Sequence, residues 1–222
     1  MPPTVLKANL LPDALADLTA RDDRLARIVA EFGPPPLWDR EPGFPTLLRI
    51  ILEQQVSLAS AKAAFDRLLA LASATTPVST TPASPLTPER FLELDDVMLK
   101  TAGFSRQKTR YGRELAGAIL AGNLNLDALD ALDDDGVRAE LTKVIGIGRW
   151  TADIYLLMAL CRPDAWPSGD LALATAARHA LGLAATPRPD ELEALGESWR
   201  PWRAVAARVL WHFYLSKGAL RK

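Results

Sequence analysis

The sequence predicts an all-α protein. Apolar residues recur at three- and four-residue spacing along much of its 222 residues, the alternation typical of β-strands is absent, and no internal repeat occurs. A hydrophobic content of 49% is enough for one sizeable core or for two small lobes that share a seam. We therefore expect helices packed on helices.

The first strong helical pattern runs from Phe44 to Leu71. It is interrupted near residues 54–57, where the hydroxyl of Ser57 is suited to cap a second helix. The interruption predicts two helices joined by a short loop.

A segment rich in proline, serine and threonine follows at residues 72–88. Proline lacks the N–H group that a helix needs, so we expect a long surface loop here. Thr87 followed by Pro88 is typical of a helix start, with a capping hydroxyl before a proline at the first helical position. Further helices are expected at about 88–101, 105–121, 134–143, 150–161, 170–182, 189–196 and 201–216.

Cysteine content and hydropathy narrow the class of protein. Cys161 is the only cysteine, so no internal disulfide forms and four thiolates for zinc or an iron–sulfur cluster are not supplied. No run of eighteen apolar residues occurs, and the first segment lacks the pattern of a secretory signal. We expect a soluble cytoplasmic protein that does not enter membranes.

The net charge of −1 argues against a nucleic-acid partner, but the distribution of charge favours one. Residues 100–113 contain five basic residues and no acidic one, and residues 199–222 contain six and again no acidic one. Residues 127–140 instead contain six carboxylates. A solvated face explains any single run of this kind, whereas two acid-free basic segments favour a surface that faces DNA.

The stretch LTKVIGIGRWTA at residues 141–152 predicts two helices joined by a tight glycine turn. Its two glycines can adopt positive φ and let the backbone approach a partner closely. The start of the second helix, with its N–H groups and positive dipole end, suits a phosphate oxygen. Such a hairpin holds DNA through the backbone without reading sequence, although glycines also end ordinary helices. The residues expected to contact phosphates are Gly146, Ile147, Gly148, Arg149 and Thr151.

IGIGRWTA, followed by an aspartate a short helix and loop later, resembles the helix-hairpin-helix signature of base-excision DNA glycosylases. Within that superfamily the chain is similar to the 3-methyladenine DNA glycosylase II (AlkA-type) group, from about residue 12 to the C-terminus. The phrases that carry the similarity are ILEQQVSLASAKAAFDRL (51–68), AGFSRQKTRYGRELA (102–116) and WRPWRAVAARVLWHFY (199–214). Larger bacterial members begin with an additional β-rich domain, for which this chain lacks room, so it resembles the compact form.

The resemblance implies an enzyme that flips alkylated bases, such as 3-methyladenine and 7-methylguanine, out of double-stranded DNA and leaves an abasic site. We expect a monomer whose partner is DNA containing damaged bases, associated with the nucleoid if the organism is bacterial. Two alternatives stay open: the same fold acting on deaminated or mismatched bases, and a protein that only binds DNA.

Asp170 stands twenty residues after Trp150, directly before an apolar helical pattern. Taken alone it is an ordinary helix cap. The resemblance implies that it is also the catalytic aspartate, and the two roles are compatible. Cleavage of an N-glycosidic bond builds positive charge on the deoxyribose, which a nearby carboxylate stabilises while it orients or deprotonates the attacking water. An alkylated purine leaves without a strong general acid, which suits a sequence with no obvious catalytic histidine. His179 and His212 both fall within expected helices, where we expect packing or surface roles.

Trp150 and Trp211 match the pocket tryptophans of the family, whose ring faces attract a cationic base. Packing in the core is the alternative for both. Bifunctional relatives carry a lysine at the position of Trp150, and tryptophan cannot form a Schiff base, so the resemblance implies a monofunctional enzyme without lyase activity. Ile154, one turn later, stands where relatives carry an aromatic residue, which predicts a more open pocket.

Gln55 stands where relatives carry the side chain that enters the duplex and fills the space left by the flipped base. A role at the end of a helix is the alternative. The resemblance also implies a structural Na⁺ or K⁺ at the hairpin, held by the main-chain carbonyls of Thr142, Val144 and Ile147. No other cofactor is implied, and the missing cysteines separate the chain from the iron–sulfur branch.

The resemblance finally implies two helical lobes with the active-site cleft between them. The central lobe, residues 44–168, carries the hairpin, and the second lobe combines residues 1–43 with 169–222. Asp170 is then expected at the junction of the lobes, where pockets tend to occur. Asp170 and Trp150 argue against a protein that only binds DNA, because such a protein needs neither.

Overall fold

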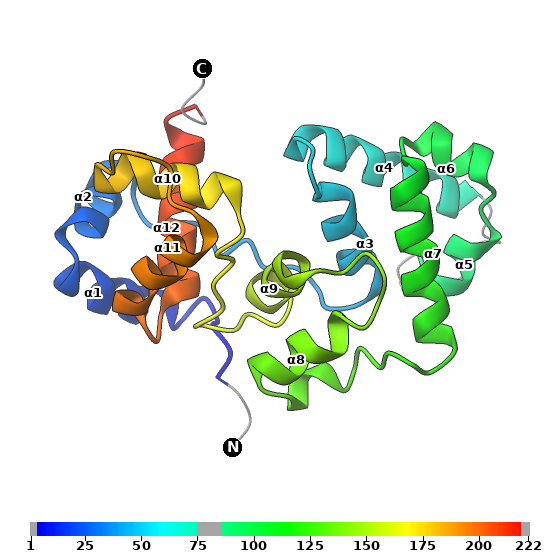
Figure 1. The fold of residues 1–222 in the computed structure, drawn as a ribbon, viewed down its shortest axis with the longest axis horizontal. Helices are drawn as coiled ribbons and strands as arrows, with labels where there is room; N and C mark the ends of the chain where they lie inside the picture. The colour runs from blue at the N-terminus through cyan, green and yellow to red at the C-terminus, as the bar shows by residue number, and fades with distance from the viewer. Residues whose placement is uncertain (1–3, 75–85, 219–222) are drawn as a thin grey trace. The chain divides into compact units, whose positions relative to one another are not determined.

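The structure, a computed structural model, describes residues 4–74 and 86–218 (Figure 1). Every regular element in these ranges is a helix, which confirms the all-α prediction. The chain divides into two compact units: unit 1 combines Met1–Asp39 with Leu156–Lys222, and unit 2 is Arg40–Tyr155.

Unit 2 is built around α3 (Phe44–Glu53), whose side chains Leu47, Leu48 and Ile50 are completely buried. Both α4 (Leu58–Ala74) and α7 (Arg106–Leu120) pack on α3. The helix α5 (Pro88–Glu93) lies close to α7 because residue 112 is glycine: a Cβ there would lie 2.6 Å from Cζ of Phe91. The other elements of this unit are α6 (Asp96–Ala102), the 3-10 helix η1 (Leu129–Ala131), α8 (Asp134–Leu141) and most of α9 (Arg149–Met158).

Unit 1 is built around α12 (Arg203–Ser216), in which all residues from 203 to 211 are buried. Figure 1 shows α10 (Leu171–Leu181), α2 (Asp23–Phe32) and α1 (Leu11–Arg21) beside it, and all three pack on it. Trp166 and Trp199 meet edge to face with ring centroids 5.5 Å apart. The remaining elements are α11 (Pro189–Gly196) and the 3-10 helix η2 (Glu197–Trp199).

Two predicted features of helix starts are confirmed. The Phe44–Leu71 pattern does break between α3 and α4, and Ser57 Oγ accepts a hydrogen bond from the N–H of Ser60 at 3.2 Å. Thr87 caps α5, since its side chain accepts from the N–H of Arg90 at 3.3 Å.

Three predicted boundaries were wrong. The single helix expected at 88–101 is two helices, because Leu94 is extended and Asp95 caps α6 by accepting from the N–H of Met98 at 2.7 Å. The helix α4 extends to residue 74, into the segment expected as a loop, because Ala72 is buried in the core. The rest of that predicted loop, residues 75–85, lies outside the described residues. The helix α9 ends at Met158 rather than 161: the chain turns at residues 159 and 160, and Cys161 then adopts a φ of +50°, outside the helical region.

Residues 156–168 belong to unit 1, whereas the sequence suggested a central lobe that runs to residue 168. Main-chain contacts explain the difference: the N–H of Leu6 donates to Cys161 at 2.6 Å and the N–H of Ala204 donates to Pro163 at 3.0 Å. Arg208 is completely buried on α12, and it donates to the carbonyls of Leu37 (2.6 Å) and Leu157 (2.8 Å). Burial lowers the pKa of Arg208 to about 10.

Two general features bear on function. Within residues 4–74 and 86–218, no helix has both the length and the apolar character needed to cross a membrane. Over the same residues, no cluster of three or more histidine, cysteine or acidic side chains offers a metal site.

Candidate active site

The predicted hairpin is present between α8 and α9. Gly146, in its turn, adopts a φ of +97°, and a Cβ at this position would lie 2.2 Å from Cγ of Tyr111. Glycine is therefore required at residue 146 both for conformation and for space. Gly148 is not in the positive-φ region, and no atom lies within 4 Å of its Cβ direction, so the backbone there is open to a partner.

The phosphate-contact residues differ in exposure. Gly148 and Arg149 are exposed, Gly146 is half-buried and Ile147 is buried at 4% exposure. Thr151 is only 1% exposed, and its hydroxyl accepts from Nε2 of Gln54 at 2.9 Å. The side chain of Thr151 therefore faces the interior of unit 2, which leaves main-chain groups as its only means of contacting a phosphate.

A buried carboxylate, Asp153, links the second helix of the hairpin to α8. Asp153 is completely buried, and its Oδ1 accepts from Nε of Arg138 at 2.7 Å. Its Oδ2 lies 3.5 Å from Nε of Arg149, one turn earlier on α9. A buried carboxylate needs such partners. The pair Arg149 and Asp153 at i and i+4 is visible in the sequence, but the link to Arg138 on α8 is not.

The carbonyls predicted to hold a monovalent cation lie in the hairpin turn. The carbonyl of Val144 accepts from the N–H of Ile147 at 3.0 Å. A carbonyl oxygen has two lone pairs, so this bond is compatible with a cation contact. Thr142 is exposed, and its hydroxyl donates to the carbonyl of Arg138 at 2.7 Å. If a cation binds, the carbonyls of residues 142, 144 and 147 would hold it and brace the turn.

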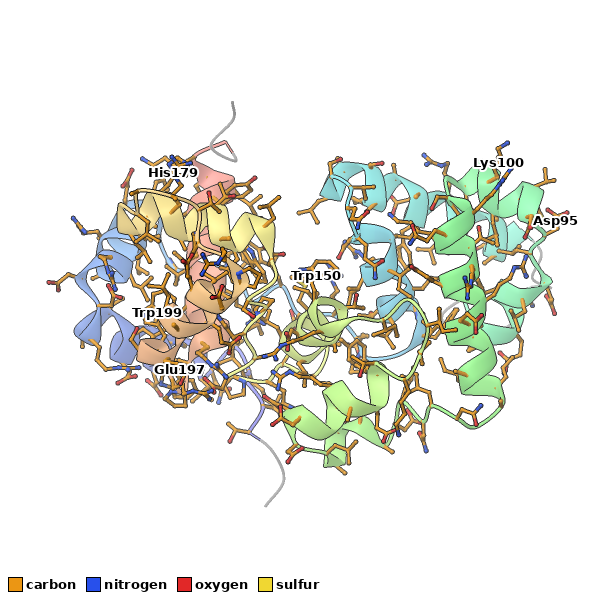
Figure 2. All side chains as sticks on the ribbon, in the orientation of Figure 1. Asp95, Lys100, Trp150, His179, Glu197 and Trp199 are labelled. Atoms are coloured by element: carbon orange, nitrogen blue, oxygen red, sulfur yellow. The ribbon has the colours of Figure 1, made fainter. Side chains whose placement is uncertain are left out.

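Trp150 is half-buried in the first turn of α9 (Figure 2). Ile154, one turn later, is buried at 3% exposure, so it belongs to the core of unit 2. Part of the surface of Trp150 is therefore accessible at the start of the hairpin helix.

Asp170 caps α10 as predicted, and its Oδ1 accepts from the N–H of Leu173 at 2.6 Å. The same oxygen accepts from Nε1 of Trp211 on α12 at 3.2 Å. Trp211 is 8% exposed, so its ring packs in unit 1 while its N–H points at the carboxylate. The structure thus brings two predicted site residues into direct contact, as a carboxylate and its hydrogen-bond donor. Two donors on one oxygen fix the direction of the Asp170 side chain.

Both histidines lie within helices of unit 1. His179 is exposed on α10 (Figure 2). His212 is half-buried on α12, with its Nε2 3.0 Å from the carbonyl oxygen of Phe32.

Gln55 is exposed in the loop between α3 and α4, with a φ of +57°. A non-glycine residue in this region is uncommon and indicates a constrained backbone. The neighbouring residue, Gln54, has a role that was not predicted: its side-chain amide donates hydrogen bonds to Gly146 and Thr151 of the hairpin.

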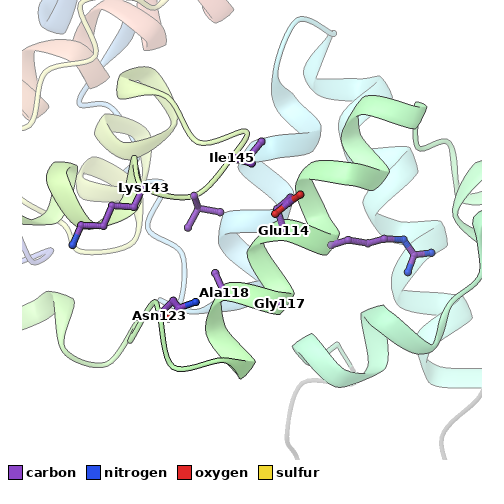
Figure 3. A pocket seen from close by; sticks show the side chains of 8 residues that line it. Glu114, Gly117, Ala118, Asn123, Lys143 and Ile145 are labelled. Atoms are coloured by element: carbon purple, nitrogen blue, oxygen red, sulfur yellow. The ribbon is translucent and has the colours of Figure 1, made fainter.

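A groove of about 520 Å³ lies between α7 and the hairpin turn in unit 2 (Figure 3). Its two basic residues are already paired, Arg113 with Asp96 at 2.8 Å and Lys143 with Glu140 at 2.6 Å, and its Glu114 lies 3.9 Å from Arg110. Its lining includes Val144 but no residue predicted for catalysis, base binding or phosphate contact. The lining residues are Arg113, Glu114, Gly117, Ala118, Asn123, Lys143, Val144 and Ile145.

A profile of the HhH-GPD superfamily base excision DNA repair proteins matches residues 48–201, which include the hairpin and Asp170. The chain belongs to this superfamily. The resemblance drawn from the hairpin phrase is therefore confirmed, and so is base excision DNA repair as the process.

HhH-GPD relatives match over most of the chain. DNA-3-methyladenine glycosylase 1 of Schizosaccharomyces pombe is 27% identical over 198 residues, which cover 89% of this chain and 83% of the relative. The solved structure of the S. pombe 3-methyladenine DNA glycosylase in complex with abasic DNA has a TM-score of 0.77 and 27% identity, covering 92% of this chain and 97% of that one. The DNA-3-methyladenine glycosidase of Bacillus halodurans has a TM-score of 0.72 and 26% identity, covering 94% and 91%.

Three contacts of the site in this HhH-GPD chain were not predicted from its sequence. Trp211 donates to Asp170 across 41 positions, and Gln54 donates to Gly146 across 92. Tyr111 fills the space beside Gly146. The only signal in the sequence was indirect: a polar pair at 54–55 where an apolar helix breaks, and a glycine in a tight turn.

Proposed function

We propose that the chain is a monofunctional DNA glycosylase that flips alkylated bases out of double-stranded DNA and hydrolyses their N-glycosidic bonds. The observation that carries the proposal is the carboxylate of Asp170, held on one oxygen by the N–H groups of Leu173 and Trp211. The HhH-GPD match places this residue inside the family region, and the relatives named above are 3-methyladenine glycosylases.

Asp170 supplies negative charge to a reaction that builds positive charge. As the bond between base and deoxyribose lengthens, the sugar becomes oxocarbenium-like, and a preorganised carboxylate stabilises it without reorganising. The carboxylate also orients or deprotonates the water that attacks the sugar. The two N–H donors on Oδ1 keep the carboxylate in one direction, so the protein need not reorient it during the reaction.

An alkylated base suits this chemistry because it leaves readily. 3-Methyladenine and 7-methylguanine carry positive charge, so they depart without a strong acid, and their electron-poor rings stack on indole faces. Trp150 offers such a face at the start of α9. Trp211 is the second predicted pocket residue, and its ring borders Asp170 through its N–H.

The absence of lyase chemistry is proposed from Trp150 itself. A lyase needs an amine that attacks the sugar to form a Schiff base, and an indole cannot do this. The product is therefore an abasic site in an uncut strand.

The hairpin is proposed to hold the duplex. The open backbone at Gly148 and the start of α9 suit a phosphate oxygen, and Arg149 adds an exposed positive charge. Gln55 is the side chain proposed to enter the space left by the flipped base, and the hairpin carbonyls are proposed to bind Na⁺ or K⁺. The protein is proposed to act as a monomer.

The test is excision of bases from DNA treated with a methylating agent. Chromatography should detect free 3-methyladenine and 7-methylguanine, and a gel should show strand breaks only after alkali treatment. Failure to release any base from methylated DNA would remove the alkylated-base proposal. Release from duplexes with uracil or hypoxanthine alone would establish the alternative substrate class. Breaks without alkali, together with a borohydride-trapped adduct, would show lyase activity.

A further inference from the structure

The loop between α3 and α4 (residues 54–57) is tied to the hairpin by one side chain. Nε2 of Gln54 donates to the carbonyl of Gly146 and to the hydroxyl of Thr151, both at 2.9 Å. Gly146 lies in the turn of the hairpin and Thr151 in its second helix. A single amide group therefore connects the loop to both parts of the hairpin.

Both acceptors are held firmly. Thr151 is 1% exposed, so its hydroxyl has little freedom to reorient. Gly146 is confined by the ring of Tyr111, which lies where a Cβ would be, and Tyr111 in turn accepts from Nε2 of Gln107 at 2.6 Å. Both acceptors of the Gln54 amide are therefore fixed in position. Their hydrogen bonds limit the movement of the Gln54 side chain and, through it, of the Gln54 backbone.

The beginning of the loop is also anchored. Nζ of Lys108 on α7 donates to the carbonyl of Leu52 at 2.5 Å, which satisfies an acceptor at the end of α3. Glu53 bonds both terminal nitrogens of Arg40, at 2.9 and 3.0 Å. With residues 52, 53 and 54 all held, Gln55 follows at a φ of +57°, exposed to solvent.

We propose that Gln54 is a positioning residue that holds Gln55 in the orientation needed to enter the duplex, with the hairpin as its support. The inference rests on the proposed role of Gln55 in filling the flipped-out space. A preordered side chain loses less conformational freedom when it inserts than a mobile one does. The hairpin and the loop then act as one DNA-binding element within unit 2.

The experiment measures preference between two duplexes of the same sequence. One carries a tetrahydrofuran abasic analogue, which leaves a space in the stack, and the other is undamaged. Fluorescence anisotropy gives the ratio of their two Kd values. Gln54→Met keeps the length of the side chain and removes both donors, so the preference for the analogue duplex should fall about tenfold.

A double-mutant cycle separates positioning from general support. If Gln54 acts through Gln55, then Gln55→Ala should reduce the preference strongly in the wild-type chain and at most about twofold in Gln54→Met. Three results would overturn the inference: an unchanged preference in Gln54→Met, an unchanged preference in Gln55→Ala, or effects of the two substitutions that simply multiply.

A second set of variants covers the case in which Gln54→Met does not fold. Thr151→Val removes one acceptor at nearly constant volume, whereas Thr151→Ser keeps it. Thr46→Val is the matched control, because Thr46 is also buried in unit 2 and donates one bond, to the carbonyl of Glu41 at 2.6 Å. Only Thr151→Val should lower the preference; equal losses in Thr151→Val and Thr46→Val would reduce Gln54 to a structural contact.

This test is independent of base release. A chain that shows the predicted duplex preferences but releases no base would contradict the proposed glycosylase and leave the positioning role intact. If the wild-type chain excises methylated bases but Gln54→Met keeps the wild-type preference for the analogue duplex, the glycosylase proposal stands and the positioning role is contradicted.

Discussion

Asp22 and Asp170 are two capping carboxylates of unit 1 with nearly the same local structure. Asp22 caps α2 and accepts from the N–H of Arg24 and from Nε1 of Trp199, both at 2.9 Å. Asp170 caps α10 and accepts from the N–H of Leu173 and from Nε1 of Trp211. In each case a helix start and an indole N–H fix one aspartate.

The two aspartates differ in what else surrounds them. Asp22 is 8% exposed, and the guanidinium of Arg24 bonds both of its oxygens, at 2.9 and 2.7 Å. Asp170 is more exposed, and the two donors that meet on its Oδ1 are uncharged. A helix start and an indole N–H are thus one way of fixing an aspartate. We attribute the different roles proposed for the two to the guanidinium that bonds Asp22 and to the greater exposure of Asp170.

Removing the charge of Asp170 should change the activity more than any other proposed substitution. Asparagine is also a good helix cap, so Asp170→Asn should keep α10 and lower kcat for excision of methylated bases by about 10²- to 10³-fold. Asp22→Asn should leave kcat close to the wild-type value. Single-turnover excision, measured well below both melting temperatures, checks the pair; full activity in Asp170→Asn would remove it from the catalytic role.

The start of α9 differs from the starts of α2 and α10 in having no side-chain cap. Gly148 stands directly before α9, its carbonyl accepts from the N–H of Ala152 at 3.1 Å, and it offers no side chain as a cap. If this start takes a phosphate from DNA, Gly148→Asp should place a competing carboxylate there and weaken duplex binding about tenfold relative to Gly148→Asn. Anisotropy with an undamaged duplex measures both variants. Equal affinity of the Asp and Asn variants would show that no phosphate sits at this position.

The two tryptophans that donate to these aspartates should also differ, with smaller effects on kcat: Trp211 should affect catalysis and Trp199 only stability. Trp211→Phe removes a donor to Asp170 and should lower kcat about fivefold, while the loss of ring volume and of one hydrogen bond lowers the unfolding free energy by about 1 kcal/mol. Trp199→Phe should leave kcat unchanged and destabilise unit 1 by about 2 kcal/mol, since it removes a buried donor to Asp22. Urea titration and excision kinetics measure the two quantities, and a loss of kcat in Trp199→Phe would break the distinction.

The smallest effect concerns acid stability. The guanidinium of Arg24 holds the pKa of Asp22 well below its usual range, burial opposes this, and the N–H of Trp199 adds to it. Because the folded pKa is depressed, the stabilisation is present above the unfolded pKa of about 3.9 and is lost as pH falls through the folded pKa. The melting temperature of Asp22→Asn should therefore fall less steeply than that of the wild type below about pH 4. If the melting temperatures of the two proteins fall in parallel as the pH is lowered, Asp22 contributes nothing to acid stability.

The local features of the fold could be predicted from the sequence. Helical spacing predicted the helices around Phe44–Leu71 and their break, the glycine turn predicted the hairpin, and the position of Asp170 before an apolar helix predicted its cap. Each depends on residues within a few positions of one another, so the chemistry that decides them is written in the local sequence. The sequence of the hairpin also allowed the superfamily to be predicted, and the family match confirms it.

The folded structure was needed to show which distant residues meet. It paired Trp211 with Asp170 and Trp199 with Asp22, and it joined Gln54 to Gly146 and Thr151. It also assigned residues 156–168 to unit 1 through the carbonyl contacts of Arg208 and the neighbouring main chain. Hydrogen bonds of this kind join atoms that are brought together by the packing of whole helices, and sequence spacing contains no record of that packing.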